Sequence, residues 1–298
     1  SYYFPKGFNY LYLIPFNKGL TVSPILDAFV DWIWDTFFYY LNAFNIFLLT
    51  NVLGPMKQAY LNMPVVSTFV LFMGAGYIIG GIRSCLIVGS LILFIALSEY
   101  WDRTLITLYM ATFAVGVSAF SGIVVGSLCS QNDFASKTIL SICDFFQTFP
   151  SFIYLIPVIL LFGITDTSVM IAAIVYASVP ATRYTVEGLR SVPPSLHDAG
   201  SMSGVSKMQR WRLIDLPLAL PHIMLGINQT VIFALMMIVL GALIGTEDLG
   251  QLIMGSLSRP NGAGIGFTLG IFISFICLAV DNLIRTWADE RKKLLGIN

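Results

Sequence analysis

Long apolar blocks, separated by short polar stretches, make up most of the chain beyond residue 60. Each block is long enough, or nearly so, to cross the ~30 Å hydrocarbon core of a bilayer as a helix. Open sheets cannot cross lipid because their backbone polar groups would remain unsatisfied. We therefore predict an all-α integral membrane protein with about seven transmembrane helices. They are placed at 64–82, 84–99, 104–128, 148–164, 167–186, 218–244 and 266–287.

The segment 1–60 has a different pattern, because it is rich in aromatic residues and interrupted by prolines. Over residues 25–48, apolar positions recur at three- and four-residue steps, while three aspartates, four residues apart, lie on another face. This amphipathicity predicts a helix that lies on the membrane surface or against the bundle. It would be either a docking surface for an external partner or a packing helix that covers neighbouring spans. We thus expect an N-terminal extracytoplasmic segment, 1–60, and a transmembrane domain, 61–298.

Composition agrees with a membrane protein, since 57% of the residues are hydrophobic, 11% are charged and the mean hydropathy is +0.82. The formal net charge is zero, which gives no indication of nucleic-acid binding. The four cysteines lack CxxC spacing and the two histidines form no HExxH pattern, so we predict neither a metal site nor disulfides. No Gly-Lys-Ser/Thr or GxSxG pattern is present, so no ATP site or catalytic residue is predicted. The sequence begins at Ser1 without Met, and we expect its natural start to lie upstream.

The most polar stretch of the chain, DAGSMSGVSKMQRWRLIDLP, lies between two apolar blocks. Its spacing resembles the cytoplasmic EAA loop of ABC importer membrane subunits, in which a short helix, a glycine turn and a second helix ending at a proline follow one another. The acid is Asp198, where that family usually has Glu, and Gly200 stands where it usually has the second Ala. The resemblance implies a coupling loop at 194–217 that docks on an ATPase subunit, with Ser195 as a helix N-cap and Asp198 as its capping-box acid. The expected coupling residues are Ser195, Asp198, Ala199, Gly200, Gly204, Lys207, Ile214, Leu216 and Pro217.

Three further segments indicate which group of ABC importers the chain resembles. They are QTFPSFIYLIPVILLFGI (147–164), LPLALPHIMLGINQT (216–230) and GTEDLGQLIM (245–254). They look like the permeases of glycine betaine and proline betaine importers, over roughly residues 60 to 290. The resemblance implies the type I ABC importer permease fold in a bacterial inner membrane. It also implies a homodimer, an extracytoplasmic binding protein, and ATP and Mg in a separate ATPase subunit, so that this chain is no enzyme and binds no cofactor. The solute would be glycine betaine or a related quaternary ammonium, methylated amine oxide or sulfonium compound.

Several polar or helix-breaking residues in the apolar blocks are candidates for the translocation pathway. Pro150 and Pro157 break the fourth block and either line a cavity or only kink a packing helix. Amides in the sixth block face the bundle interior, as pathway residues or as interhelical hydrogen-bonding groups. Methionines and a phenylalanine beyond them form either a soft lining for a methylated cation or plain packing. The candidates are Gln147, Pro150, Pro157, Asn228, Gln229, Phe233, Met236 and Met237.

Basic residues predict the orientation. With the coupling loop in the cytoplasm, alternation of the spans places eleven basic residues inside and five outside, which follows the positive-inside rule. The five outside are Lys6, Lys18, Lys57, Arg103 and Arg259. The N-terminus is then outside and the C-terminus cytoplasmic.

An ion-gradient-driven secondary transporter is the alternative. Such a protein is expected to carry acidic residues at the middle of its spans. Four acidic residues of this chain instead fall near predicted span ends, namely Glu99, Asp144, Asp166 and Asp281. A fifth, Glu187, is expected to pair on one helix face with its neighbouring arginines, Arg183 and Arg190.

A cysteine at position 203 tests this topology. We expect Ser203→Cys to react with a membrane-impermeant thiol reagent only from the cytoplasmic side, because the coupling loop lies there. Labelling of whole cells from outside would overturn the orientation of every span.

Overall fold

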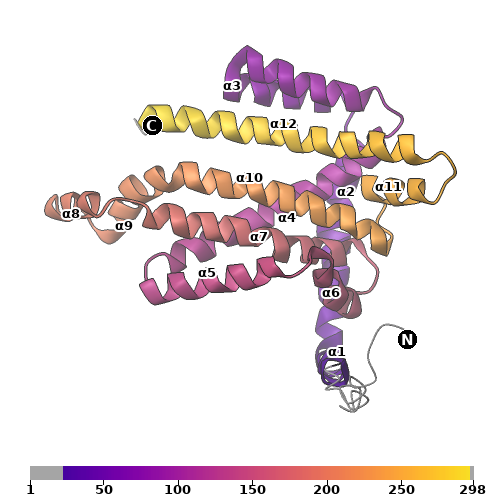
Figure 1. The fold of residues 1–298 in the computed structure, drawn as a ribbon, viewed down its shortest axis with the longest axis horizontal. Coiled ribbons are helices and arrows are strands. Elements are labelled where there is room, and N and C mark those ends of the chain that lie inside the picture. Colours follow the sequence, from indigo (N-terminus) through magenta and orange to yellow (C-terminus); the bar gives the residue numbers. More distant parts are fainter. Residues whose placement is uncertain (1–22, 296–298) are drawn as a thin grey trace, which may run out of the picture.

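The described part of the chain, residues 23–295 of a computed structural model, consists of helices joined by short turns and contains no strand. Residues 1–22 of the predicted N-terminal segment, with Lys6 and Lys18, lie outside it. The α-helices are α1 (Ser23–Leu48), α2 (Gly54–Leu61), α3 (Val65–Ala96), α4 (Trp101–Cys129), α5 (Asp133–Thr148), α6 (Leu155–Phe162), α7 (Asp166–Arg190), α8 (Pro194–Met202), α9 (Lys207–Arg210), α10 (Leu216–Gly241), α11 (Leu249–Leu257) and α12 (Ala263–Leu295). Figure 1 shows α3, α4, α5, α7, α10 and α12 running side by side, with α1 across them.

Six helical stretches of the described residues are long and apolar enough to cross a membrane, and a bent pair of helices is a seventh candidate. The six are Asp27–Leu61, Val65–Ala96, Trp101–Cys129, Asp166–Arg190, Lys207–Ile244 and Ala263–Lys293. This confirms the predicted all-α membrane protein with about seven spans.

The α3 element, Val65–Ala96, is a hairpin of two helices that meet at a kink. Gly80 and Gly81 lie outside the helical region, and Gly81 has φ 63° and ψ −158°, a conformation essentially restricted to glycine. A Cβ on Gly76 would lie 2.9 Å from the Cys85 Cα. In a straight helix, nine residues would separate these positions by about 13 Å. The segments predicted at 64–82 and 84–99 are therefore the two arms of this hairpin.

The prediction of a single span at 148–164 is wrong. The helix that runs along the bundle here is α5, and α5 and the following stretch Ser151–Phe162 are bent by 104°. Pro150, with φ −55° and ψ 132°, begins a 3-10 turn between them. The sequence pattern missed α5 because its charged residues, among them Asp133 and Lys137, gave it the appearance of a polar loop. Figure 1 shows α5 beside α7 and α6 turned away from both.

The amphipathic helix α1 crosses the direction of the bundle. By length and hydropathy Asp27–Leu61 would qualify as a span, but Figure 1 shows it running across the other helices. Its aromatic side chains are largely exposed, and Tyr39 is 78% exposed. Near its end, the Asn45 side chain donates a 3.1 Å hydrogen bond to the Phe162 carbonyl of α6. The structure therefore supports a helix that lies against the bundle, with aromatic residues suited to a membrane interface.

The core of the bundle is α7, which packs between α4 and α10. Glycines bring the backbones together, as in small-residue contacts of membrane helices. A Cβ on Gly122 of α4 would lie 2.5 Å from the Ala181 Cβ, and a Cβ on Gly226 of α10 would lie 2.7 Å from the Tyr184 Cβ. Neither contact has room for a larger residue.

Polar contacts join α2, α7 and α11 at the end of the bundle that we call the α11 end. The Lys57 ammonium lies 3.2 Å from Glu247 Oε2 and 3.7 Å from Asp166 Oδ2, and the Tyr109 hydroxyl donates a 2.6 Å hydrogen bond to Asp166. Asp248 caps α11 by accepting a 3.0 Å hydrogen bond from the Gln251 amide. Its side chain is fully buried, and burial raises the pKa of Asp248 to about 7.

A valine at Gly76 tests the α3 hairpin. Gly76→Val is expected to lower the stability of the chain by about 1–3 kcal/mol, because its Cβ meets the backbone of Cys85, which cannot rotate away. The measurement is the midpoint of thermal unfolding in detergent. Gly74→Val is the control, since nothing lies within 4 Å of a Cβ there. Equal midpoints for the two variants would contradict the hairpin.

The buried carboxyl of Asp248 predicts a pH dependence of stability. Its folded-state pKa is raised, so the folded protein holds a proton that the unfolded chain releases near its ordinary value of 3.8. Stability should thus fall as pH rises from about 4 to 7, by about 1.4 kcal/mol per pH unit. Asp248→Asn, which keeps the capping oxygen, should flatten this slope in unfolding midpoints measured from pH 5 to 8.

The exposed neighbour Glu247 provides the control for that series. Glu247→Gln should retain the wild-type slope, because the Glu247 side chain is 61% exposed. The same slope in wild type and Asp248→Asn would show that another group titrates.

Candidate functional site

Two short helices form the predicted coupling loop. Figure 1 shows α8 and α9 at one end of the bundle, which we call the α8 end, with the last turns of α12 at the same end. The chain turns at Gly204, whose φ of 73° strains any residue except glycine. The amides of Ser203 and Val205 both donate to the Gly200 carbonyl, at 3.2 and 3.3 Å. The loop is thus a helix, a glycine turn and a second helix.

The helix caps differ from the prediction. Ser195 is the second residue of α8, which begins at Pro194, so Ser195 is not an N-cap and forms no capping box with Asp198. Proline suits the first helical position because its missing N–H would be unpaired there. The capping box belongs to the second helix, where the Ser206 side chain accepts from the Gln209 amide and the Gln209 side chain accepts from the Ser206 amide. The S-x-x-Q pattern that signals it was present in the sequence.

The second helix does not end at Pro217. It continues from Lys207 through Ile244 into the membrane span. Residues Trp211–Asp215 form a π-helical turn, and the Leu216 amide donates to the Trp211 carbonyl five residues back. This wider turn stands directly before Pro217, which has no N–H to donate. Leu216 and Pro217 therefore open α10 instead of closing the loop.

Gly200 allows α8 to lie close to the second helix. It is buried, and a Cβ there would lie 3.2 Å from Ile214 Cδ1 and 3.4 Å from Val205 Cγ2. Asp198 and Lys207 are exposed, while the side chain of Ala199 lies outside the described residues. A cavity of about 520 Å³ opens between the two helices, lined by Leu196, Gly200, Ser203, Val205, Gln209, Arg210, Leu213, Ile214, Pro217 and Leu218.

The structure separates the pathway candidates of α10. Asn228 is buried and donates a 2.6 Å hydrogen bond to Asp281 of α12, so it ties two helices together. Met237 lies in the core with no exposed surface, whereas Met236 is 46% exposed. Adjacent helical residues point in different directions, so these two methionines do not share a lining. Gln229 and Phe233 are half-buried and four residues apart on one face.

Pro157 does not break a helix, since it lies in the first turn of α6, where a missing N–H costs nothing. Pro150 begins the turn before α6 and is exposed. Of these two prolines, only Pro150 marks the bend between α5 and α6.

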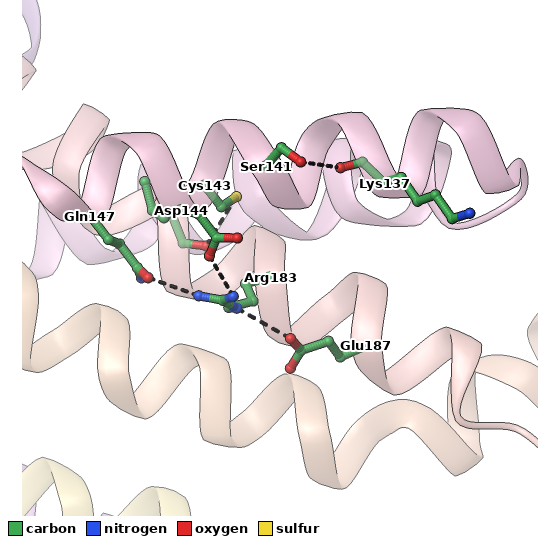
Figure 2. Close-up of polar contacts among 8 residues, drawn as sticks. Lys137, Ser141, Cys143, Asp144, Gln147, Arg183 and Glu187 are labelled. Atoms are coloured by element: carbon green, nitrogen blue, oxygen red, sulfur yellow. Dashed lines mark hydrogen bonds and ion pairs between the residues drawn. The ribbon is translucent and has the colours of Figure 1, made fainter.

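Arg183 of α7 is the centre of a polar cluster with α5, shown in Figure 2. Its guanidinium lies 2.6 Å from Asp144 Oδ1 and 3.2 Å from Glu187 Oε1, and it donates a 2.9 Å hydrogen bond to Gln147 Oε1. The predicted pair between Arg183 and Glu187 is therefore present. Arg190 instead pairs with Asp133 of α5, which sequence spacing could not show.

A stack of aromatic rings also links α7 to its neighbours. The rings of Tyr176 and Phe233 are 5.0 Å apart and 15° from parallel. Tyr154 lies 5.3 Å from Tyr176 and 6.1 Å from Phe146, measured between ring centroids. Sequence analysis singled out only Phe233 among these rings. Tyr176 was missed, although it stands out as the sole aromatic among the small residues of the Ala172–Ala181 stretch.

Residues 119–293 match the family described as "Binding-protein-dependent transport system inner membrane component". The chain belongs to this family. The match begins within α4 and ends within α12, so it includes the coupling loop, the Arg183 cluster and the aromatic stack. The helices α1 to α3 lie outside it.

Relatives of this permease family are similar over nearly the whole chain. The trimethylamine N-oxide transport system permease protein TmoV of Pelagibacter ubique is 61% identical over 297 residues, which are 100% of this chain and 41% of the relative. TmoV of Ruegeria pomeroyi is 38% identical over 95% of this chain and 42% of the relative. The glycine betaine transport system permease protein OpuAB of Bacillus subtilis is 30% identical, over 92% of this chain and 96% of the relative. The chain thus spans about two fifths of the length of the two TmoV proteins.

Proposed function

We propose that the chain is the membrane-spanning permease subunit of an ATP-driven ABC importer for a small methylated ammonium compound. The similarity to TmoV of Pelagibacter ubique, 61% identity over 297 residues, carries this proposal and favours trimethylamine N-oxide as the solute. Glycine betaine is the second candidate, because OpuAB, named for its transport, is 30% identical over 92% of the chain. Carnitine and sulfonium compounds belong to the panel of solutes to be tested.

The coupling loop is the proposed contact with a separate ATPase subunit, which would bind ATP and Mg and perform the hydrolysis. The exposed side of α8 offers Asp198 and, beyond it, Met202, which is 91% exposed. A displacement of α8 would press on Ile214 through the close contact at Gly200. Because Ile214 belongs to the helix that continues into α10, the displacement would reach the membrane span. This chain itself contributes no catalytic residue to the reaction.

The proposed orientation has the α8 end in the cytoplasm and the N-terminus outside, in a bacterial inner membrane. Basic residues support it, because Arg190, Lys207 and Arg210 stand at the α8 end, while Lys57 and Arg103 contact the segment before α11. The positive-inside rule assigns the more basic end to the cytoplasm. An extracytoplasmic binding protein would then deliver the solute at the α11 end, to a pathway formed by two copies of this chain.

Acidic residues within the spans support an ATP-driven over an ion-driven transporter. Asp144 lies in the last turn or so of α5 beside Arg183, as the sequence suggested, whereas Asp281 lies well inside α12 with Arg285 at 2.6 Å. Each carboxylate is paired with an arginine. An ion-coupled carboxylate has to release and rebind its ion, which a close arginine opposes.

A charge reversal at Asp198 tests the proposal. The complex of this chain with its ATPase and binding protein is reconstituted in vesicles, and solute uptake and ATP hydrolysis are measured for trimethylamine N-oxide, glycine betaine, carnitine and a sulfonium analogue. We expect one or more solutes to stimulate hydrolysis. Asp198→Lys should lower stimulated hydrolysis and uptake by about tenfold, because it disrupts the contact between the loop and the ATPase.

Glu290→Lys is the matched control, since it reverses an exposed helical acid near the end of α12 and should leave both rates unchanged. Normal uptake by Asp198→Lys at equal protein level would remove the coupling role. Uptake that follows an ion gradient without an ATPase would replace the proposal with secondary transport.

A further inference from the structure

The Arg183 cluster lies on a face of the chain that cannot meet lipid. Arg183 stands seven residues before the end of α7, which places it about 10 Å from that end of the helix. Its partners remain accessible, with the side chains of Asp144 and Glu187 59% and 46% exposed. Charged side chains that face lipid at this depth are costly, so such residues face a bundle interior or a water-filled cavity. This face therefore borders water or another protein chain.

The aromatic stack lies on the same face. Tyr176 and Arg183 are seven residues apart on α7, which is nearly two full turns, so their side chains leave the helix in about the same direction. Arg183 bonds Gln147 of α5, and the Tyr176 ring contacts Tyr154 and Phe233, so the cluster and the rings lie along one side of α7. We call the surface made by Phe146, Gln147, Tyr154, Tyr176, Arg183 and Phe233 the α5/α7/α10 face.

This face offers unused hydrogen-bond donors beside its rings. Gln147 uses its side-chain oxygen to accept from Arg183, and no hydrogen bond within residues 23–295 involves its amide nitrogen. The hydroxyl of Tyr176 likewise has no hydrogen bond to any described residue, and both side chains are half-buried. The N–H and O–H groups therefore remain available to a bound molecule.

The charges and rings favour one kind of ligand. Aromatic rings attract methylated ammonium groups through their negative faces. The cluster holds two carboxylates, Asp144 and Glu187, against the single guanidinium of Arg183, so its formal charge is negative and suits a cation. Free N–H and O–H donors suit an oxygen that carries negative charge. A molecule that joins a trimethylammonium group to such an oxygen satisfies both halves of the face.

We propose that the α5/α7/α10 face is a transient binding site for a trimethylammonium compound with a negatively charged oxygen. The methyl groups rest on Tyr154, Tyr176 and Phe233, and the oxygen accepts hydrogen bonds from the Gln147 amide and the Tyr176 hydroxyl. This inference rests on the proposed function, and it adds the residues that hold the solute and the direction in which the solute lies. Tyr154 and Tyr176 become specificity-determining residues of the permease itself.

Saturation-transfer NMR of methyl protons tests the site, because the method detects weak binding. The purified complex of permease and ATPase, without binding protein, is mixed with trimethylamine N-oxide or with tetramethylammonium, which lacks the oxygen. Wild type should give a saturable signal with both. Tyr176→Leu and Phe233→Leu should each lower the affinity for both compounds by about tenfold, because the aromatic faces are lost.

Two variants separate stacking from hydrogen bonding. Tyr176→Phe should keep tetramethylammonium binding and weaken only the N-oxide, because the ring remains and the hydroxyl is lost. Gln147→Leu should have the same selective effect. A general loss of folding would instead weaken both compounds equally, which neither variant is expected to do.

Phe94→Leu is the matched control, because Phe94 packs against Phe272 and Phe275 of α12, away from this face. This variant should bind both compounds as wild type does. Wild-type affinity in Tyr176→Leu and Phe233→Leu, or no signal from a wild-type complex that transports the N-oxide, would overturn the site alone. A wild-type complex that neither transports nor responds to any methylated solute would overturn the proposed function.

Discussion

The close contact of α7 with α4 and α10 is the constraint on which the rest of the structure depends. Each interface has glycines where a methyl group would overlap its neighbour, as at Gly122 against Ala181 and Gly226 against Tyr184. The α4 and α10 helices also contact each other, and α5 packs against α7 beside them. Arg183 of α7 contacts α5, and Tyr176 of α7 stacks on Phe233 of α10. The small residues of the bundle therefore decide which large and charged residues remain accessible.

Charge within the spans follows two patterns. Asp281 of α12 accepts from Asn228 of α10, which joins the two helices, and pairs with Arg285 within α12. The Arg183 cluster instead lies on an accessible face and joins α7 to α5 with its carboxylates still half exposed. The Asp281 carboxylate thus supports helix packing, whereas the accessible carboxylates of the Arg183 cluster need water or a partner beside them.

The sequence predicted the glycine turn at Gly204 through its resemblance to the EAA loop, and most of the apolar spans through hydropathy. It misplaced the cap at Ser195 and the helix end at Pro217, since a proline at the first helical position and a π-helical turn replaced the expected signals. It missed α5 because paired charges make that helix appear polar. Tyr176 was hidden for another reason, namely that its neighbours Phe233 and Tyr154 belong to distant parts of the chain.

The continuous helical stretch from Lys207 to Ile244 is one rod that joins the α8/α9 loop to the aromatic stack. Ile214, under α8, and Phe233, in the aromatic stack, lie on this rod about 28 Å apart along its axis. A tilt of the rod by roughly 5° about one of these points would shift the other by roughly 2.5 Å, about half the pitch of a helical turn. In the proposed mechanism the rod would act as a lever, so that a small push on Ile214 would move Phe233 against Tyr176.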